Sequence, residues 1–233
     1  MIYGLIFTAG KQSRFDSETP KALMPYGNHT LLDINIANMS TVCDKTFVVC
    51  SHENHTWFET YPHIEISSGR GCGDAVLTAL SHLDLVDDDT VFIQWGDCLH
   101  TKDIYYTLKD VYKGQWLIPC VYEESPYVQI IPSINNKVTV NFSKYHESIT
   151  SGFHDLSLFY GGAKLMREHL QCFADNISVD GCYTHKHGNE LQFLDVFNET
   201  DINASIVAIA DYESFDFNTL EEFHVLMNNK ILR

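Results

Sequence analysis

Positive charge is scarce in this sequence. It contains 15 Lys and Arg residues against 31 Asp and Glu residues, so its formal net charge is −16 at pH 7. This excess of negative charge argues against nucleic acid or an anionic membrane surface as a partner, because both repel an acidic protein. It also makes any short stretch with several cations stand out as a candidate anion site.

Long hydrophobic runs and paired cysteines are also missing. The apolar stretches are strand-sized, whereas a membrane-spanning helix needs about 20 apolar residues. The N-terminus has no basic region and no small-residue cleavage site, so we expect its apolar segment to be a strand rather than a signal peptide. The sequence has no Cys-x-x-Cys pair, and an odd number of spaced cysteines is typical of free thiols in a reducing cytoplasm. The seven are Cys43, Cys50, Cys72, Cys98, Cys120, Cys172 and Cys182.

Strand-like and helix-like segments alternate in the first half of the chain. We expect strands near residues 3–8, 45–51, 64–67 and 90–95, with helices near 31–39, 73–83 and 102–112. This order predicts a parallel sheet with helices on both faces. We find no internal repeat and no low-complexity linker, so we expect one domain over residues 1–233.

The pattern changes in the second half. After a strand at 116–122, segments 127–132 and 137–142 flank a turn and predict an antiparallel hairpin. A strand at 154–160, a helix at 163–173, a loop at 175–189 and a short helix at 190–198 follow. The chain then returns to a strand at 205–210 and a helix at 219–231, which Thr219 and Glu222 open as a capping box.

The densest group of cations follows the first predicted strand. Small residues end this strand, and three cations fall within positions 11–21; they are Thr8, Ala9 and Gly10, then Lys11, Arg14 and Lys21. Small residues allow a phosphate to approach the backbone, and their N–H groups can form an anion nest. Since loops at the carboxyl ends of parallel strands bind ligands, we expect a polyphosphate here, most simply a nucleoside triphosphate. A solvated loop with incidental basic residues is the alternative.

Three other segments carry candidate site residues. The glycine-rich stretch 68–75 contains Gly71 and Cys72 and precedes a predicted helix. Asp97 follows Gly96 at the end of a buried strand, where a carboxylate can hold Mg²⁺. Asp216 and Asn218 lie two residues apart, so in an extended segment they share a face. The structural alternatives are a flexible turn, a turn aspartate and a helix cap, respectively.

The first loop resembles the signature of the sugar-phosphate nucleotidyltransferase family, Leu-Ala-Ala-Gly-x-Gly-Thr-Arg-Met followed after a short variable stretch by Pro-Lys. It matches at Gly10, Arg14, Pro20 and Lys21, and departs at Gln12, where the family has its second glycine. The similarity extends to the uridylyltransferase, cytidylyltransferase and molybdopterin guanylyltransferase branches. It implies a Rossmann-like α/β fold of the GT-A type, with three α/β/α layers, a mixed but mostly parallel sheet and an inserted antiparallel hairpin region.

The resemblance also implies roles for the candidate residues. Arg14 and Lys21 would be catalytic, with Thr8, Ala9, Gly10, Lys11, Gly71, Cys72 and Asp97 at the nucleotide. Asp97 with Asp216 or Asn218 would hold Mg²⁺. The implied reaction joins an NTP to a phosphorylated acceptor such as a sugar 1-phosphate and releases pyrophosphate. CTP and UTP are the foremost candidates for the NTP. Residues 1–113 would bind the nucleotide, 114–200 the acceptor, and 201–233 would return to the sheet with the second metal contact.

The acceptor region matches the family less well. Tyr127, Lys144, Asp155 and Ser157 occupy the corresponding places, but the glutamate and the Asn-Thr-Gly triplet of the uridylyltransferase are missing, which argues against N-acetylglucosamine 1-phosphate. A glycosyltransferase on a related fold and a non-catalytic nucleotide-binding protein remain alternatives. The sequence leaves open whether the chain is a monomer or a homodimer.

The loop with Cys182, His185 and His187 contains residue types suited to zinc. Its spacing does not match a closed zinc site, so we favour a surface loop.

Overall fold

The computed structural model describes residues 1–10, 15, 17–67, 69–145, 149–186, 188–210, 212 and 217–231, without the side chains of 228–231. Lys11, Arg14 and Asp216 lie outside the described residues, as do Gln12 and His187. No described helix is long and apolar enough to span a bilayer.

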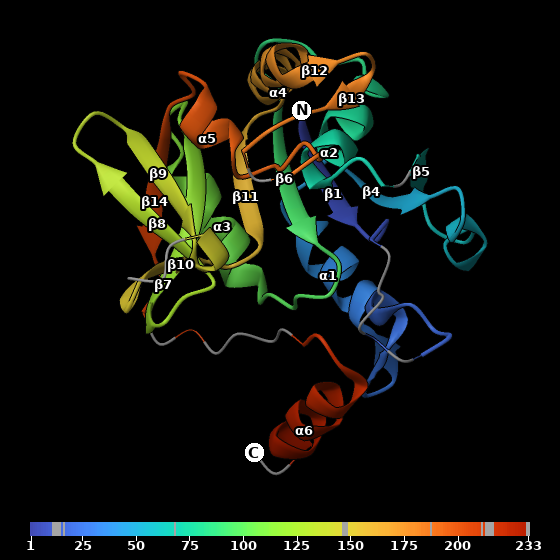
Figure 1. The fold of residues 1–233 in the computed structure, drawn as a ribbon. Helices are drawn as coiled ribbons and strands as arrows, with labels where there is room; N and C mark the ends of the chain where they lie inside the picture. Colours follow the sequence, from blue (N-terminus) through green and yellow to red (C-terminus); the bar gives the residue numbers. More distant parts are fainter. Residues whose placement is uncertain are drawn as a thin grey trace.

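A ten-stranded mixed sheet runs through the whole molecule (Figure 1). Its parallel part has the order β5 (His63–Ile66), β4 (Lys45–Ser51), β1 (Ile2–Phe7) and β6 (Thr90–Trp95). The registers pair Leu5 with Phe47 on one side and with Ile93 on the other. The inner strands β1 and β6 are almost continuously buried, as expected of a parallel sheet that helices cover on both faces, whereas the edge strand β5 alternates between buried and partly exposed residues.

The second part of the sheet is largely antiparallel. Strand β11 (Leu158–Gly162) runs antiparallel to β6 and leads to β7 (Trp116–Glu124) and β10 (Ser151–Asp155). The hairpin of β8 (Val128–Ser133) and β9 (Lys137–Phe142) completes this edge, and β14 (Ala204–Ala208) pairs in parallel with β7. Two further pairs lie outside the main sheet, β2 (Pro25–Tyr26) with β3 (His29–Thr30) and β12 (Ser178–Val179) with β13 (Cys182–Tyr183).

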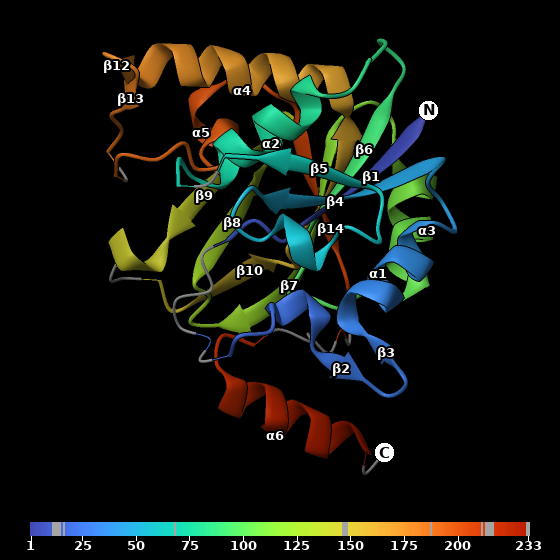
Figure 2. The same cartoon turned by 90° about the vertical axis from the view of Figure 1, so that its right-hand side faces the viewer.

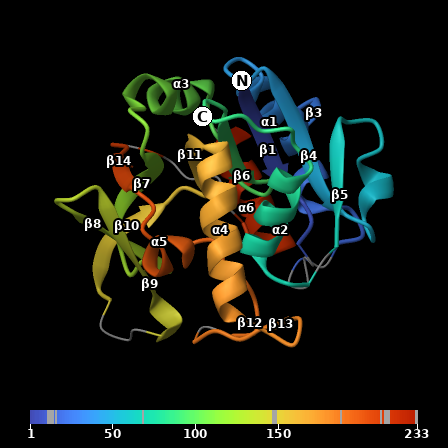
Figure 3. The ribbon, with the colours of Figure 1, turned by 90° about the horizontal axis from the view of Figure 1, so that it is seen from above.

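Helices cover the two faces of the sheet, as Figure 3 shows from above. Helices α2 (Cys72–Ser81) and α4 (Ala163–Ile177) pack together on one face, and α1 (Leu31–Met39) and α3 (Lys102–Val111) cover the other. Because side chains alternate along a strand, Leu5 and Ile93 belong to the first core, whereas Ile6 and Phe92 belong to the second. The expected α/β/α layers and the mixed, mostly parallel sheet are confirmed.

Local sequence explains several helix ends. At α1, the Asp33 N–H donates to Thr30 Oγ1 at 3.0 Å and the Asp33 carboxylate accepts the Thr30 N–H at 2.9 Å. The predicted box at helix α6 (Leu220–Ile231) also forms, because Glu222 Oε2 accepts the Thr219 N–H and Thr219 Oγ1 accepts the Glu222 N–H. Such reciprocal contacts satisfy N–H groups that a helix start otherwise leaves unpaired.

Helix α6 lies at the end of the molecule away from α4, next to the β2–β3 hairpin (Figure 2). Phe217 and Phe223 form a small separate core there with Phe15, Met24 and Leu31. This packing brings the C-terminal segment to the loop that follows β1.

Three predicted elements differ from the structure. The expected strand at 154–160 is two strands, β10 and β11, which both run along β7 and are separated by a bend at Ser157, whose φ is +58°. The predicted loop at 175–189 contains the end of α4 and the β12–β13 pair. The predicted helix at 190–198 is irregular at residues 190–192 and forms a turn at residues 193–195, and helix α5 covers only Val196–Glu199.

Candidate active site

A cleft of about 520 Å³ opens at the carboxyl ends of β1 and β6. The chain leaves β1 for β4 on one side of the sheet, and β6 lies on the other side of β1, so this is the switch point where open α/β sheets bind ligands. Seven residues that the sequence singled out line it. They are Thr8, Ala9, Gly10, Lys21, Gly71, Cys72 and Asp97.

Lys21 is the buried cation of the cleft, with 7% of its surface exposed. It begins a short 3₁₀ turn (Lys21–Leu23) after Pro20. Its Nζ donates to the Phe217 carbonyl at 2.8 Å and lies 3.3 Å from Asp97 Oδ2. The rings of Phe15 and Phe217 lie 5.7 and 5.6 Å from the ammonium. A cation in such surroundings is held in a fixed place and interacts strongly with a nearby anion, since the local dielectric is low.

Asp97 faces Lys21 from the end of β6. The preceding residue is Gly96, and the Gly96 N–H donates to the Phe7 carbonyl at 2.9 Å. A Cβ at Gly96 would lie 2.9 Å from both the Phe7 oxygen and Thr8 Cγ2. Glycine is therefore required for β6 to end against β1, which brings the Asp97 carboxylate beside the cation loop.

The backbone after β1 is anchored before it reaches the cleft. The Thr8 N–H and Oγ1 both donate to the Val49 carbonyl, at 2.8 and 3.1 Å, and Asn54 Nδ2 donates to the Thr8 carbonyl at 2.9 Å. A Cβ at Gly10 would meet nothing within 4 Å. The anchor fixes the start of the loop, while open space remains beside Gly10 for a ligand.

The opposite wall of the cleft is the loop that starts α2. Gly71 adopts a φ of +102°, which favours glycine, and it caps the helix. Burial raises the pKa of the Cys72 thiol to about 11, so the thiol is protonated at neutral pH and donates to Gln192 Oε1 at 3.4 Å. The helix N-terminus thus borders the cleft and favours negative charge there.

Sequence reasoning missed part of the cleft wall. Trp95 and Ile66 end strands β6 and β5 at the cleft, and Glu190 contributes a second carboxylate to the lining. Trp95 and Ile66 are apolar residues at strand ends, so the sequence carried no chemical sign that they line a site. Glu190 comes from a segment for which we predicted a helix, so the sequence did not show that it reaches Gly71.

The four expected acceptor residues do not belong to the cleft lining that the structure describes. Tyr127 is exposed on the hairpin side, and Lys144 Nζ lies 4.7 Å from the centre of the Tyr145 ring. A hydrogen bond with Tyr145 raises the pKa of Lys144, and the charge of Glu190 adds to this effect. Lys144 is therefore within electrostatic range of the cleft rim.

Asp155 and Ser157 lie at the bend between β10 and β11. Asp155 is buried, and its Oδ1 accepts the Ser157 N–H at 2.9 Å. Burial raises the pKa of this carboxyl group. The Ser157 carbonyl accepts the Trp95 N–H at 3.0 Å, so this bend supports the cleft wall from behind.

Asp97 is the expected metal ligand that lines the cleft. Asn218 lies beside Phe217, whose carbonyl holds Lys21, and the Asn218 N–H donates to Glu222 Oε2 at 2.6 Å. Within the described residues, no group of three or more His, Cys, Asp or Glu side chains could hold a metal ion by itself. A metal at Asp97 would thus need oxygens from a bound phosphate or water, which is the usual pattern for Mg²⁺.

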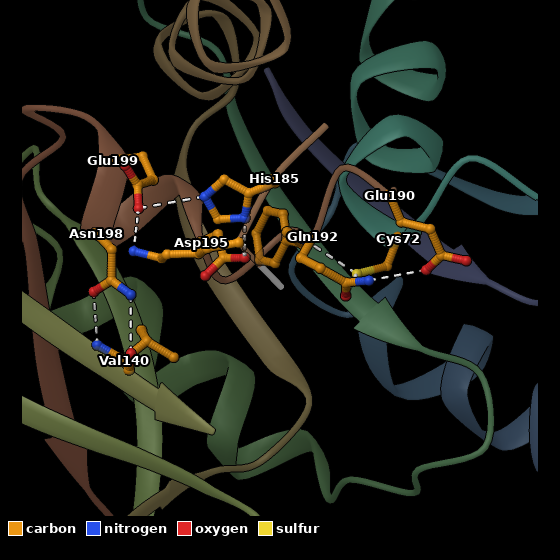
Figure 4. A network of polar contacts seen from close by, with 10 residues as sticks. Cys72, Val140, His185, Glu190, Gln192, Asp195, Asn198 and Glu199 are labelled. Carbon is orange, nitrogen blue, oxygen red and sulfur yellow. Dashed lines mark hydrogen bonds and ion pairs between the residues drawn. The ribbon is translucent and has the colours of Figure 1, made fainter. Parts of the chain in front are cut away.

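The loop for which zinc was the less favoured interpretation contains a histidine that lies between two carboxylates. His185 Nδ1 lies 3.4 Å from Asp195 Oδ2, and its Nε2 lies 3.5 Å from Glu199 Oε1 (Figure 4). Lys186 pairs with Glu199 at 2.6 Å, whereas Cys182 is exposed on β13. Contacts with two carboxylates therefore account for His185 in the described part of the loop.

Comparison with known proteins identifies the family. The sequence model of the MobA-like NTP transferase domain matches residues 4–172, and the chain therefore belongs to this family of nucleotidyltransferases. The match contains both the loop after β1 and Asp97. Members of this family are enzymes that transfer nucleotidyl groups, so the expected enzyme class is confirmed.

Two curated relatives share part of the sequence. A stretch of 107 residues is 32% identical to the bifunctional protein GlmU of Ruthia magnifica subsp. Calyptogena magnifica, over 41% of this chain and 22% of the relative. A stretch of 104 residues is 32% identical to GlmU of Synechococcus elongatus, over 42% and 23% of the two chains. The match thus spans less than a quarter of each relative.

Two solved structures share the whole fold. HddC from Yersinia pseudotuberculosis superposes with a TM-score of 0.70 at 12% identity, over 99% of this chain and all of that one. The CTP:phosphocholine cytidylyltransferase LicC from Streptococcus pneumoniae gives a TM-score of 0.69 at 14% identity, over 100% and 99% of the two chains. These likenesses confirm the nucleotidyltransferase fold.

Proposed function

We propose that this protein couples a nucleoside triphosphate to a small phosphorylated acceptor, for which a sugar 1-phosphate is the first choice, and releases pyrophosphate. The observation that carries the proposal is the buried Lys21, held beside Asp97 at the carboxyl ends of β1 and β6. The name of the structural neighbour LicC, a CTP:phosphocholine cytidylyltransferase, fits this reaction class. The one continuous sheet supports a single domain that contains both substrate sites.

In the proposed reaction an oxygen of the acceptor phosphate attacks the α-phosphorus in line with the bond to the β-phosphate. A new P–O bond forms, the old one breaks, and its electron pair leaves with pyrophosphate. The attacking oxygen is already anionic, so the step requires no strong general base. The protein has to bring two anions together and stabilise the charge that develops.

The residues of the cleft suit these tasks. Lys21 lies where it can neutralise the α-phosphate and the acceptor phosphate, because its ammonium lines the cleft and its stem is fixed by Phe15 and Phe217. The backbone at Ala9 and Gly10 offers close approach to the β- and γ-phosphates. Arg14, which lies outside the described residues, is proposed to hold the leaving pyrophosphate.

The donor set also suits a divalent cation. Asp97 is a half-buried carboxylate, with 34% of its side chain exposed, and it faces the space beside the proposed phosphates. We propose that it holds Mg²⁺ together with Asp216 or Asn218; a bound Mg²⁺ would offset charge on the phosphates. Asp97 is 3.3 Å from Lys21, so it also keeps the ammonium positioned.

We further propose that the enzyme works in the cytoplasm. All seven cysteines are present as free thiols, which suits a reducing compartment.

The test is a pyrophosphate-release assay with each NTP and a panel of phosphorylated sugars, polyols and amino alcohols. We expect release with at least one pair, dependent on both substrates and on Mg²⁺. Asp97→Asn should lower the rate roughly 10²- to 10³-fold, as loss of one transition-state contact does. The matched control is Asp103→Asn on α3, an exposed carboxylate outside the cleft. Absence of pyrophosphate with every pair would contradict the proposal.

A further inference from the structure

Glu190 is a carboxylate in the cleft that the proposed reaction does not use. Among the described lining residues three carry charge, namely Lys21, Asp97 and Glu190. Lys21 and Asp97 lie 3.3 Å apart and largely offset each other, so Glu190 adds negative charge to the lining. A phosphate would be repelled at this position. The charge of Glu190 also raises the pKa of Lys144 at the cleft rim, and within the cleft its carboxylate suits a part of the substrates that carries no negative charge.

The segment that carries Glu190 is joined to the α2 loop by backbone hydrogen bonds. The Leu191 N–H donates to the Arg70 carbonyl at 2.9 Å, and the Gly73 N–H donates to the Leu191 carbonyl at 2.8 Å. A Cβ on Gly71 would lie 2.4 Å from the Leu191 oxygen and 2.9 Å from Glu190 Cβ. Gly71 thus allows the two segments to touch, and Glu190 lies directly against the Gly71–Cys72 loop, which the family resemblance assigns to the nucleotide.

Side chains also fix this arrangement (Figure 4). Gln192 Nε2 donates to Glu190 Oε2 at 2.9 Å, and Gln192 Oε1 accepts the Cys72 thiol at 3.4 Å. The Phe193 N–H donates to Cys72 Sγ at 3.2 Å. The glutamate carboxylate is therefore oriented from its own segment, which in turn is held by Cys72. Since each carboxylate oxygen accepts more than one hydrogen bond, Glu190 retains capacity for a substrate donor.

An ionised carboxylate accepts hydrogen bonds and donates none, so it discriminates between bases by their edges. Cytosine carries an amino donor at its fourth ring position, where uracil carries a carbonyl acceptor. Glutamate and aspartate accept hydrogen bonds from the cytosine amino group in protein–nucleic acid complexes. The uracil carbonyl would instead place two acceptors against each other, which costs the desolvation of both.

We infer that Glu190 is a specificity-determining residue that accepts a hydrogen bond from the amino group of the nucleotide base. Between the two pyrimidine nucleotides it selects CTP over UTP. This inference rests on the proposed function, because it assumes that the nucleotide occupies this cleft. Gln192 and Cys72 act as positioning residues for the carboxylate.

The test compares CTP and UTP binding by calorimetric titration in the presence of Mg²⁺, which requires no knowledge of the acceptor. A hydrogen bond to a charged group predicts that wild-type protein binds CTP roughly 10- to 100-fold more tightly than UTP. In Glu190→Gln the amide can donate as well as accept, so the preference should fall to within about threefold. Glu168→Gln is the matched control, because Glu168 is an exposed carboxylate on α4 outside the cleft and should leave the preference unchanged.

The outcomes separate the two proposals. Equal binding of CTP and UTP by wild-type protein, tighter binding of UTP, or a CTP preference that survives in Glu190→Gln would overturn the assignment of Glu190 while the nucleotide site stands. In the pyrophosphate-release assay, Glu190→Gln could raise the KM for the acceptor and leave the preference for CTP over UTP unchanged. That result would assign Glu190 to the acceptor and overturn the inference. Binding of no nucleotide would overturn both proposals.

Discussion

Replacing Lys21 by methionine removes the charge at the centre of the proposed site and keeps most of the side-chain volume. In the folded protein the Lys21 ammonium donates to the Phe217 carbonyl at 2.8 Å and lies 3.3 Å from Asp97. The methionine side chain still fills the space between Phe15 and Phe217. The change therefore tests the ammonium rather than the packing of the 3₁₀ turn.

The expected magnitudes follow from these contacts. The buried Phe217 carbonyl loses its donor, which lowers the free energy of unfolding by about 1–3 kcal/mol. Loss of the cation over the two phenylalanine rings adds about 0.5–1 kcal/mol. The effect on catalysis is separate from this loss of stability. A cation aimed at transition-state charge contributes roughly 10²–10³ in rate, so we expect the turnover rate to fall by this factor.

The assay measures pyrophosphate release at saturating substrates. Urea unfolding at the assay temperature first establishes that both the wild-type protein and the variant are folded. Lys109→Met is the control, since Lys109 is an exposed lysine on α3 and should change neither rate nor stability appreciably. A folded Lys21→Met protein that turns over within about threefold of wild type would refute the role of Lys21. A rate lost together with the folded state would show a structural role alone.

Two further predictions concern stability. Gly96→Ala should lower the free energy of unfolding by about 1–3 kcal/mol and weaken NTP binding, since its Cβ would press on the Phe7 carbonyl and Thr8. Gly10→Ala, which has open space, should stay within about 0.5 kcal/mol of wild type in urea unfolding; equal losses would contradict the packing argument. Burial lowers the pKa of His100 from 6.5 to about 3, so below about pH 6.5 the unfolded chain binds a proton that the folded protein excludes. Stability should therefore fall as the pH is lowered, and His100 should contribute about 2 kcal/mol of this loss by about pH 5. In urea unfolding at about pH 7.5 and about pH 5, His100→Phe should lose correspondingly less than wild type, and equal losses would refute this account.

Much of the parallel half of the fold follows from local sequence. The strands at 45–51 and 90–95 and the helix at 31–39 have the bounds that the pattern predicts. Each strand contains an uninterrupted apolar run, and the helix begins at a capping box. The Thr30–Asp33 box marks the helix start without reference to the rest of the chain. By contrast, the bend at Ser157 combines a positive φ with a hydrogen bond from the Trp95 N–H. Trp95 is distant in sequence, so the local pattern did not predict this bend.

The site divides in the same way. Lys21 and Asp97 are 76 positions apart, and the family resemblance assigned both to one site, where the structure places them in contact. Glu190 was not predicted, since its segment is held in place by backbone hydrogen bonds with Arg70 and Gly73 rather than by its own sequence pattern. Contacts of this kind depend on the tertiary structure and overrule local preference.

The central claim is that the cleft between the loop after β1 and the start of α2 binds a nucleoside triphosphate. A crystal structure with a non-hydrolysable NTP analogue and Mg²⁺ tests it most directly. The account predicts the triphosphate against Ala9, Gly10 and Lys21, a metal ion at Asp97, and the base against Gly71. A nucleotide bound at another place, with this cleft empty, would contradict the account.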